Sequence, residues 1–272
     1  MTKDPFLSPA ASPAPSPEPR PTATELALAI ARRAIRTEFQ AKVALASGAL
    51  VGMEALARWT DPELGVISPE LFVPLAERCG LIARLTALVL ADALAAARLL
   101  RAAHPQATVA VNISPVLLDD PALPGAIAAA LMTSGLPAAA LVAEITEGTP
   151  FAHPARAAQV LTELSRHGVI CAMDDFGTGY ATLPALLEMP FAELKIDRSF
   201  VARAVELPEA AKLVRATIRL AQALGLRVVA EGVETAEVAA MLREAGCDIG
   251  QGHHYGRAMP LDALLARWPG SS

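Results

Sequence analysis

The chain has 272 residues, of which 53% are hydrophobic and 19% charged, so it is long enough to bury the core of one large domain. A net charge of −5 argues against binding of a nucleic-acid polymer through a broad basic surface. An odd set of three cysteines does not suggest a disulfide framework, and we therefore expect a cytoplasmic protein. The longest apolar stretch, residues 85–100, is interrupted by Asp92 and Arg98, so no membrane span is expected.

The start of the chain differs in composition from the rest. Residues 1–24 are crowded with Pro, Ser and Ala, and they lack both a periodic apolar pattern and the basic and apolar regions of a signal peptide. We interpret 1–24 as a disordered segment with polyproline character and 25–272 as a single domain. Composition alone also leaves open that this tail binds a protein partner.

The predicted elements begin with a helix from Glu25 that carries apolar residues as far as Ile35 on one face. A hairpin follows, with strands at 43–45 and 50–53 around a turn at 46–49, and its second strand ends at Glu54. Beyond it, short apolar strands alternate with helices that are predicted at 69–77, 82–103, 121–134, 155–167, 182–188, 209–224, 236–245 and 261–268. Such alternation predicts a parallel sheet covered by helices, and the length suits an α/β barrel of the (β/α)8 type.

Each predicted strand ends in a polar residue of a restricted kind. The acids, amides and lysine at these ends are Glu54, Asn112, Glu144, Asp174, Lys195, Glu231 and Gln251. In a parallel barrel the ends of the strands meet at one mouth, where the chemistry of such barrels is found. One acid at a strand end is often only a helix cap or an ion-pair partner. Several acids at one mouth, however, would repel one another strongly unless cations were bound.

The residue types indicate metal-assisted hydrolysis. Hard oxygen ligands select Mg²⁺, Mn²⁺ or Ca²⁺ over zinc or copper, and the adjacent Asp174 and Asp175 could reach two ions. Two metal ions about 3.5–4 Å apart clamp both oxygens of a phosphoryl transfer and supply hydroxide near neutral pH. Lys195 would orient the water and offset developing negative charge. His253 and His254 lack a third histidine nearby, so we interpret them as residues of the pocket wall or as structural residues.

Ordered blocks of the sequence resemble the EAL-domain family, the cyclic di-GMP phosphodiesterases. The resemblance covers almost the whole chain from about Glu25 and rests on segments 54–59 (EALARW), 111–115 (VNISP), 144–147 (EITE), 174–180 (DDFGTGY), 194–197 (LKID), 230–235 (AEGVET) and 251–252 (QG).

The resemblance implies a TIM-like (β/α)8 barrel with one antiparallel strand. It also implies hydrolysis of cyclic di-GMP to linear pGpG by two-metal activation of water, with Mg²⁺ or Mn²⁺ as cofactor, Ca²⁺ as an inhibitor and a homodimer as the assembly. The implied metal ligands are Glu54, Asn112, Glu144, Asp174 and Asp175. Lys195, Glu231, Asp175 and Gln251 match catalytic residues, Gln40 and Arg58 match substrate contacts, and Glu234 matches the anchor of the loop after Asp175.

The sequence departs from the family pattern near the expected guanine pocket. Ala41 stands where the family usually has proline, His253, His254 and Tyr255 follow Gln251-Gly252, and Ala258 replaces a frequent proline. None of these changes removes an expected metal ligand, so an enzyme is favoured. The alternative is a non-catalytic cyclic di-GMP receptor, or a protein-interaction module, of the same fold. An enolase-type barrel also carries acids and a lysine at strand ends, but the chain has no room for the capping domain such barrels carry.

Overall fold

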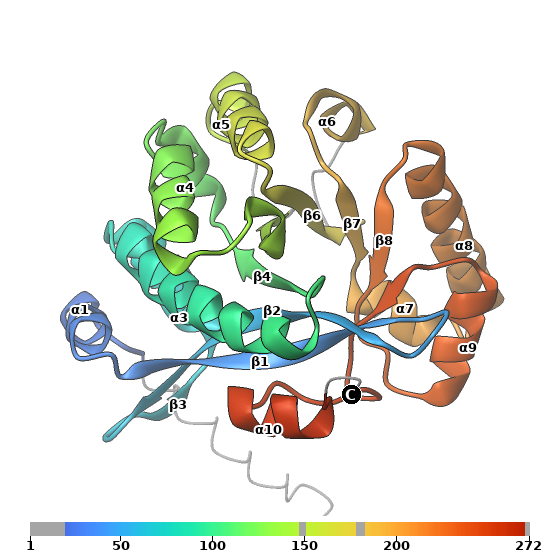
Figure 1. The fold of residues 1–272 in the computed structure, drawn as a ribbon, viewed down its shortest axis with the longest axis horizontal. Coiled ribbons are helices and arrows are strands. Elements are labelled where there is room, and N and C mark those ends of the chain that lie inside the picture. The colour runs from blue at the N-terminus through green and yellow to red at the C-terminus, as the bar shows by residue number, and fades with distance from the viewer. Residues whose placement is uncertain (1–19, 147–150, 178–182, 270–272) are drawn as a thin grey trace, which may run out of the picture.

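The computed structural model of the chain describes residues 20–146, 151–177 and 183–269. Within these residues nine strands form one sheet in the order β1-β9-β8-β7-β6-β5-β4-β2-β3. The sheet closes into a barrel because β1 pairs with β2 as well as with β9, while β3 extends β2 outside the barrel (Figure 1). The strands are β1 (Ile35–Ala44), β2 (Leu50–Asp61), β3 (Gly65–Ile67), β4 (Thr108–Asn112), β5 (Leu141–Thr146), β6 (Ile170–Phe176), β7 (Glu193–Ile196), β8 (Arg227–Ala230) and β9 (Ile249–Gly250).

The direction of the strands confirms the expected fold. From β2 through β4 to β9 each barrel strand runs parallel to the next, whereas β1 is antiparallel to both of its neighbours. A hairpin can join only antiparallel strands, so the β1–β2 hairpin places the single reversed strand at the start of the barrel.

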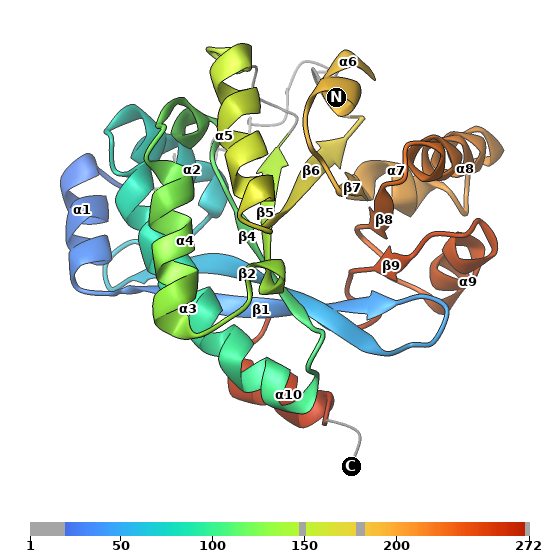
Figure 2. The ribbon, with the colours of Figure 1, turned by 45° about the horizontal axis from the view of Figure 1, so that its top comes forward.

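Helices surround the barrel and cover the outer face of its strands (Figures 1 and 2). They are α1 (Ala23–Ala31), α2 (Pro69–Arg78), α3 (Ile82–Ala103), α4 (Leu123–Ser134), α5 (Pro154–Arg166), α6 (Leu183–Glu188), α7 (Arg198–Arg203), α8 (Pro208–Ala223), α9 (Ala236–Glu244) and α10 (Leu261–Arg267), with 3-10 turns at Pro115–Asp119 and Ala138–Ala140. The helix α10 packs against β1, so the last helix of the described chain contacts its first strand (Figure 1).

The first helix is shorter than predicted. It begins at Ala23 behind a capping box made by Thr22 and Glu25, and it ends at Ala31. Arg33 then has a φ of 53°, and Ile35 already pairs with Trp59 in the β1–β2 ladder. The prediction that Ile35 belongs to a helical face was therefore wrong, because pairing along the hairpin overrode the local apolar spacing. With its cap at Thr22, the first helix begins two residues before the predicted start of the domain at residue 25. Residues 1–19 of the proposed disordered segment lie outside the described residues.

The hairpin is longer than predicted, and one short helix was missed. Strand β2 does not end at Glu54 but continues to Asp61, so Glu54 lies in the middle of a strand. The helix α7, which begins directly after β7, was not expected; Asp197 caps it by accepting a hydrogen bond from the Ser199 backbone N–H at 2.9 Å.

Two apolar layers result from the alternation of side chains along the strands. The large core lies between the sheet and the helices, where Trp59 of β2 meets Phe72 of α2 edge to face at a centroid distance of 5.9 Å. A separate cluster of Ala110, Val142 and Ala172 lies on the opposite face of the strands, inside the barrel. These small interior residues leave room for the longer polar side chains that follow two positions later on the same strands.

Among the described residues, none of the helices combines the length and the apolar character needed to cross a membrane. The thiols of Cys79, Cys171 and Cys247 are free.

Candidate active site

The polar residues predicted from strand ends converge because they share the interior face of the barrel. Asn112 follows Ala110, Glu144 follows Val142 and Asp174 follows Ala172, each by two positions along its strand. Residues two apart on a strand point to the same side. Barrel closure then brings side chains from β2, β4, β5, β6, β7 and the segments after β8 and β9 to one place.

Lys195 is the centre of this group. Its Nζ lies 2.7 Å from Glu231 Oε1 and 2.9 Å from Glu144 Oε2. The same atom lies 3.0 Å from Asp174 Oδ1 and 3.7 Å from Glu54 Oε2. The lysine side chain is fully buried. Burial alone would lower the pKa of Lys195, but the four carboxylates hold that pKa well above its ordinary value.

Two amides fix the orientation of Glu54. Asn112 Nδ2 donates to Glu54 Oε1 at 2.8 Å, and Gln251 Nε2 donates to Glu54 Oε2 at 2.5 Å. Gln251 Nε2 also donates to Gln40 Oε1 at 3.0 Å, and Gln40 Nε2 donates to the Gly256 carbonyl at 3.1 Å. Among the described residues, Gln251 Oε1 is a buried side-chain oxygen without a hydrogen-bond partner. A buried polar atom without a partner is uncommon in folded proteins.

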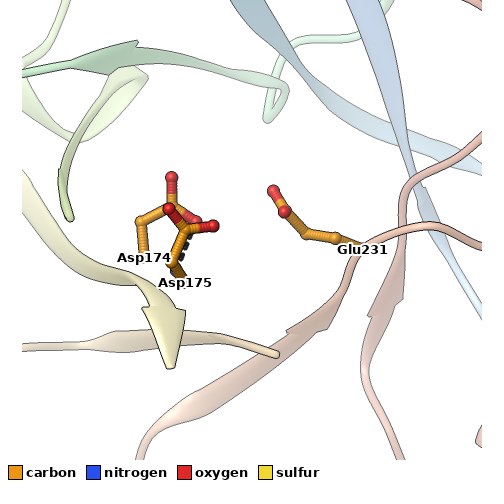
Figure 3. A group of neighbouring side chains, drawn as sticks. All are labelled: Asp174, Asp175 and Glu231. Atoms are coloured by element: carbon orange, nitrogen blue, oxygen red, sulfur yellow. Dashed lines mark hydrogen bonds between the residues drawn. The ribbon is translucent and has the colours of Figure 1, made fainter. Parts of the chain in front are cut away.

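A bulge in β6 lets two consecutive aspartates face the same space. In a regular strand, Asp174 and Asp175 would point to opposite faces. Here the pairing of β6 with β7 shifts register between Met173 and Phe176, and Asp175 has a φ of 57°. Both carboxylates consequently turn toward Glu231 (Figure 3), and ligand atoms of the three acids lie within 4.8 Å of one another. The Asp175 backbone N–H donates to Asp174 Oδ1 at 2.9 Å, which holds the bulge.

Burial raises the pKa values of three acids of the site, Asp175, Glu231 and Glu144. Burial, reinforced by the charge of Asp174, raises the pKa of Asp175 to about 6. Burial also raises the pKa of Glu231 to about 7, although the charge of Lys195 opposes the shift. The pKa of Glu144 is raised by its burial in the same way. In Glu54, by contrast, the charge of Lys195 and the two amide donors outweigh burial, and the pKa is lowered.

A pocket of about 500 Å³ opens above these groups. It is lined by Gln40, Glu54, Leu56, Glu70, Asp174, Asp175, Asp197, Arg198, Glu231, Gly232, Glu234, Gln251, Gly252 and His253. The expected loop anchor Glu234 thus lies on the pocket wall, but residues 178–182 of the loop it is expected to anchor are outside the described residues. His253 lies on the wall too, as the sequence predicted.

Arg58 pairs with a different carboxylate from those that surround Lys195. It donates from Nε to Glu38 Oε2 at 3.1 Å and from a terminal nitrogen to the Ala57 carbonyl at 3.0 Å. It lines a neighbouring, more apolar pocket of about 440 Å³ between β2, α2 and α3, which it shares with Asn112 and Asp175. The structure therefore brings Gln40 together with the predicted metal ligands but places Arg58 at the edge of the group.

Two buried charged residues of the interior were missed. Lys42 Nζ lies 3.2 Å from Glu144 Oε1 and 3.3 Å from Glu193 Oε2, and all three side chains are almost wholly buried. A signal existed in the sequence: Lys42 follows Gln40 by two positions and Glu193 precedes Lys195 by two, so each shares a strand face with a predicted site residue.

The donor set fits divalent metal ions. It consists of carboxylate and amide oxygens, without His or Cys, and this is the ligand type that Mg²⁺, Mn²⁺ and Ca²⁺ prefer. The acidic trio of Asp174, Asp175 and Glu231 lines the same pocket as Gln251, whose buried Oε1 has no hydrogen-bond partner among the described residues. With such ions bound, the arrangement could neutralise the phosphate of a substrate and hold a water molecule beside it.

Comparison with known proteins agrees with this geometry. The EAL domain model matches residues 23–258. The chain is 38% identical over 243 residues to the bifunctional diguanylate cyclase/cyclic di-GMP phosphodiesterase MucR of Pseudomonas aeruginosa, covering 89% of this chain and 36% of that protein. It is 39% identical over 233 residues to the cyclic di-GMP phosphodiesterase RocR of the same organism, covering 86% of this chain and 59% of RocR. The chain thus spans only part of the length of these curated relatives.

Solved structures show the same fold. The structure described as the PaMucR phosphodiesterase in complex with c-di-GMP superposes with a TM-score of 0.83 at 38% identity, covering 89% of this chain and 98% of that one. The FimX EAL domain from Pseudomonas aeruginosa bound to c-di-GMP gives a TM-score of 0.77 at 25% identity, covering 86% and 95%. The barrel, the order of its site residues and the match over most of its length establish that the chain belongs to the EAL domain family.

Proposed function

We propose that the chain hydrolyses cyclic di-GMP to linear pGpG and that the reaction depends on divalent metal ions. The observation that carries this proposal is the convergence of Glu54, Glu144, Asp174 and Glu231 on Lys195 at the mouth of the barrel. The substrate is supported by the names of MucR and RocR and by the c-di-GMP in the PaMucR structure.

In this proposal the cofactor is Mg²⁺ or Mn²⁺, held as two ions by Glu54, Asn112, Glu144, Asp174 and Asp175. Such ions supply Lewis-acid stabilisation of a phosphoryl group and make water nucleophilic near neutral pH. Ca²⁺ accepts more ligands in a looser geometry than Mg²⁺, and we propose that it supports substrate binding but inhibits turnover.

The protein groups orient the water and move its proton. Lys195 exchanges one of its carboxylate partners for the attacking water, donates an N–H to that water and stabilises the negative charge that develops on the phosphoryl oxygens. Glu231 accepts the proton of that water, and its position 2.7 Å from Lys195 Nζ places it beside the water that the lysine holds. The water oxygen bonds to phosphorus as the bond to the 3′-oxygen breaks. The ring opens to leave a terminal 5′-phosphate, and the released 3′-oxygen takes up a proton from bulk water. Gln251 keeps Glu54 in place through Nε2.

Substrate contacts and assembly complete the proposal. Gln40 and Arg58 contact the dinucleotide, and Arg58 pairs with a phosphate after exchanging its present partner Glu38. Glu234 anchors the loop after Asp175 and couples it to a homodimer. We further propose a cytoplasmic location and a protein partner for the N-terminal segment 1–24.

A chromatographic assay of the purified chain tests the central claim. The chain is incubated with cyclic di-GMP alone, with Mg²⁺ or Mn²⁺, and with Ca²⁺, and pGpG is quantified; binding is measured in parallel by calorimetry in Ca²⁺. Product that appears only with Mg²⁺ or Mn²⁺ would support the enzyme. Tight binding without product would overturn hydrolysis and leave a receptor of the same fold.

A further inference from the structure

A second charged layer lies inside the barrel beneath the candidate active site. Lys42 of β1 contacts both Glu144 and Glu193, at 3.2 and 3.3 Å. Arg227 binds the other oxygen of Glu193, and its own side chain is 42% exposed. The layer is thus a chain of ion pairs that leads from a partly exposed arginine through the barrel interior to Glu144.

The directions of the strands place this charged layer two residues deeper in the barrel than the candidate active site. Because β1 runs antiparallel to the other strands, Lys42 lies deeper than Gln40, its neighbour on the same face. Strand β7 runs the other way, so Glu193 lies deeper than Lys195, again by two positions. The two lysines therefore approach the buried Glu144 carboxylate from opposite levels.

Each oxygen of Glu144 has its own lysine. Oε2 accepts from Lys195 at 2.9 Å and faces the group of carboxylates, whereas Oε1 accepts from Lys42 at 3.2 Å. The terminal torsion of a glutamate has a broad, shallow preference, so a carboxylate held at one oxygen can rotate. Lys42 is the contact that removes this freedom and keeps Oε2 directed toward the mouth.

Stability alone gives little reason for such a layer. Replacing a buried ion pair by apolar residues of similar volume is often neutral or stabilising, because the desolvation of two charges offsets their attraction. Groups that bind a metal ligand from behind, on the other hand, commonly set its orientation and hence the affinity for the metal.

We propose that Lys42 is a positioning residue of the metal site: it holds Glu144 in its ligating orientation, and the Glu193–Arg227 pair holds Lys42. This inference rests on the proposed function only in that Glu144 is taken as a metal ligand. It assigns Lys42 no contact with the substrate.

Titration of the metal-free chain with Mn²⁺, followed by calorimetry, tests the inference without relying on turnover. In Lys42→Met the affinity for Mn²⁺ is expected to fall about tenfold or more. The product-forming activity should then recover when Mn²⁺ is raised by a similar factor. Leu100→Ala is the matched control, since Leu100 is fully buried in the outer core of α3 and its truncation lowers stability without touching the interior layer.

A double variant separates positioning from folding. Lys42→Met leaves Glu193 buried beside Arg227 alone, so it is compared with Lys42→Met combined with Glu193→Leu, from which Arg227 can turn to solvent. Thermal stability should be higher in the double variant than in the single one, whereas Mn²⁺ affinity should stay weak in both. Should the single variant not fold, the double variant carries the same affinity test.

Wild-type Mn²⁺ affinity in either folded variant would overturn the positioning role. A loss of affinity in Leu100→Ala as large as in Lys42→Met would overturn it as well, because the effect would then follow stability. A wild-type chain that binds Mn²⁺ but forms no pGpG would contradict the proposed hydrolysis, and the affinity comparison would still decide the role of Lys42.

Discussion

The Nζ atom of Lys195 lies 2.7 Å from Oε1 of Glu231, an ion pair that joins β7 to the segment directly after β8. The lysine is fully buried, while the glutamate side chain is 18% exposed at the floor of the pocket. This pair links the most buried cation of the site to the acid that faces the pocket.

Replacement of Lys195 by Met is expected to lower the rate of hydrolysis by a factor on the order of 10²–10³, because the site loses a hydrogen-bond donor. The unfolding free energy should also fall, by about 3–5 kcal/mol, because buried carboxylates lose their common cation. The size of this loss follows from the complete burial of Lys195 among these acids. Rates from the chromatographic assay and unfolding by urea measure both effects.

Lys212→Met is the control for Lys195→Met, since Lys212 is exposed on α8. It should change stability by no more than about 0.5 kcal/mol and leave hydrolysis intact. Residual hydrolysis near the wild-type rate in Lys195→Met would contradict the role given to this lysine.

Divalent metal ions are expected to raise the melting temperature of the chain, because they bind carboxylates whose charges otherwise repel one another. Metal at a hundred times its dissociation constant adds about 2.7 kcal/mol to the folded state. In a domain of this size that corresponds to about 5–10 °C. Thermal unfolding with Mn²⁺ and with a chelator measures the difference.

Glu54→Gln should abolish most of this metal-induced shift, since it removes one expected ligand while keeping the size of the side chain. Glu209→Gln, on the exposed first turn of α8, is the matched control and should keep the full shift. An equal shift in both variants would mean that the metal stabilises the protein from somewhere else.

Without metal, stability is expected to fall as pH rises from about 4.5 to 7, because folding raises the pKa of Asp175 to about 6 and of Glu231 to about 7. A carboxyl group whose pKa is higher in the folded state holds its proton more tightly there, so its ionisation favours the unfolded chain. Glu193 acts in the opposite sense, since Lys42 and Arg227 outweigh its burial and lower its pKa; its contribution is lost only below its ordinary value of 4.5.

Melting temperatures in a chelator across this pH range test the prediction, and Asp175→Asn should flatten part of the slope. Metal binding requires the ionised acids, so the stabilisation by Mn²⁺ should grow over the same range. A metal-free melting temperature that rises steadily from pH 5 to 7 would contradict the raised pKa values.

Gly252→Ala is expected to lower stability by about 1–3 kcal/mol and to reduce hydrolysis. A Cβ at this position would overlap the backbone nitrogen and oxygen of Val233, and the strain would fall on the segment that carries Gln251. Gly125→Ala, in α4, is the control: a Cβ there meets nothing within 4 Å, and alanine in a helix is favoured over glycine by up to about 1 kcal/mol. Comparable stability of the two variants in urea would show that the segment can adjust to the extra methyl group.

Local patterns in the sequence determined the fold class and most of the site. Short apolar runs alternating with amphipathic stretches predicted the parallel strands and their covering helices, and the polar residue after each run predicted Asn112, Glu144, Asp174 and Glu231 at one mouth. These features could be predicted because alternation along a strand and the helical period are properties of neighbouring residues.

The closure of the barrel determined those features of the fold and the site that local sequence patterns do not predict. The sequence does not show that β1 starts at Ile35, that Lys42 reaches Glu144 across the interior, or that a bulge turns Asp175 to the same side as Asp174. Each depends on which strands become neighbours and on the stagger between them, and these are set by pairing between residues far apart in the chain. The sequence by itself therefore determined which groups the protein carries, and the tertiary structure decided which of them meet.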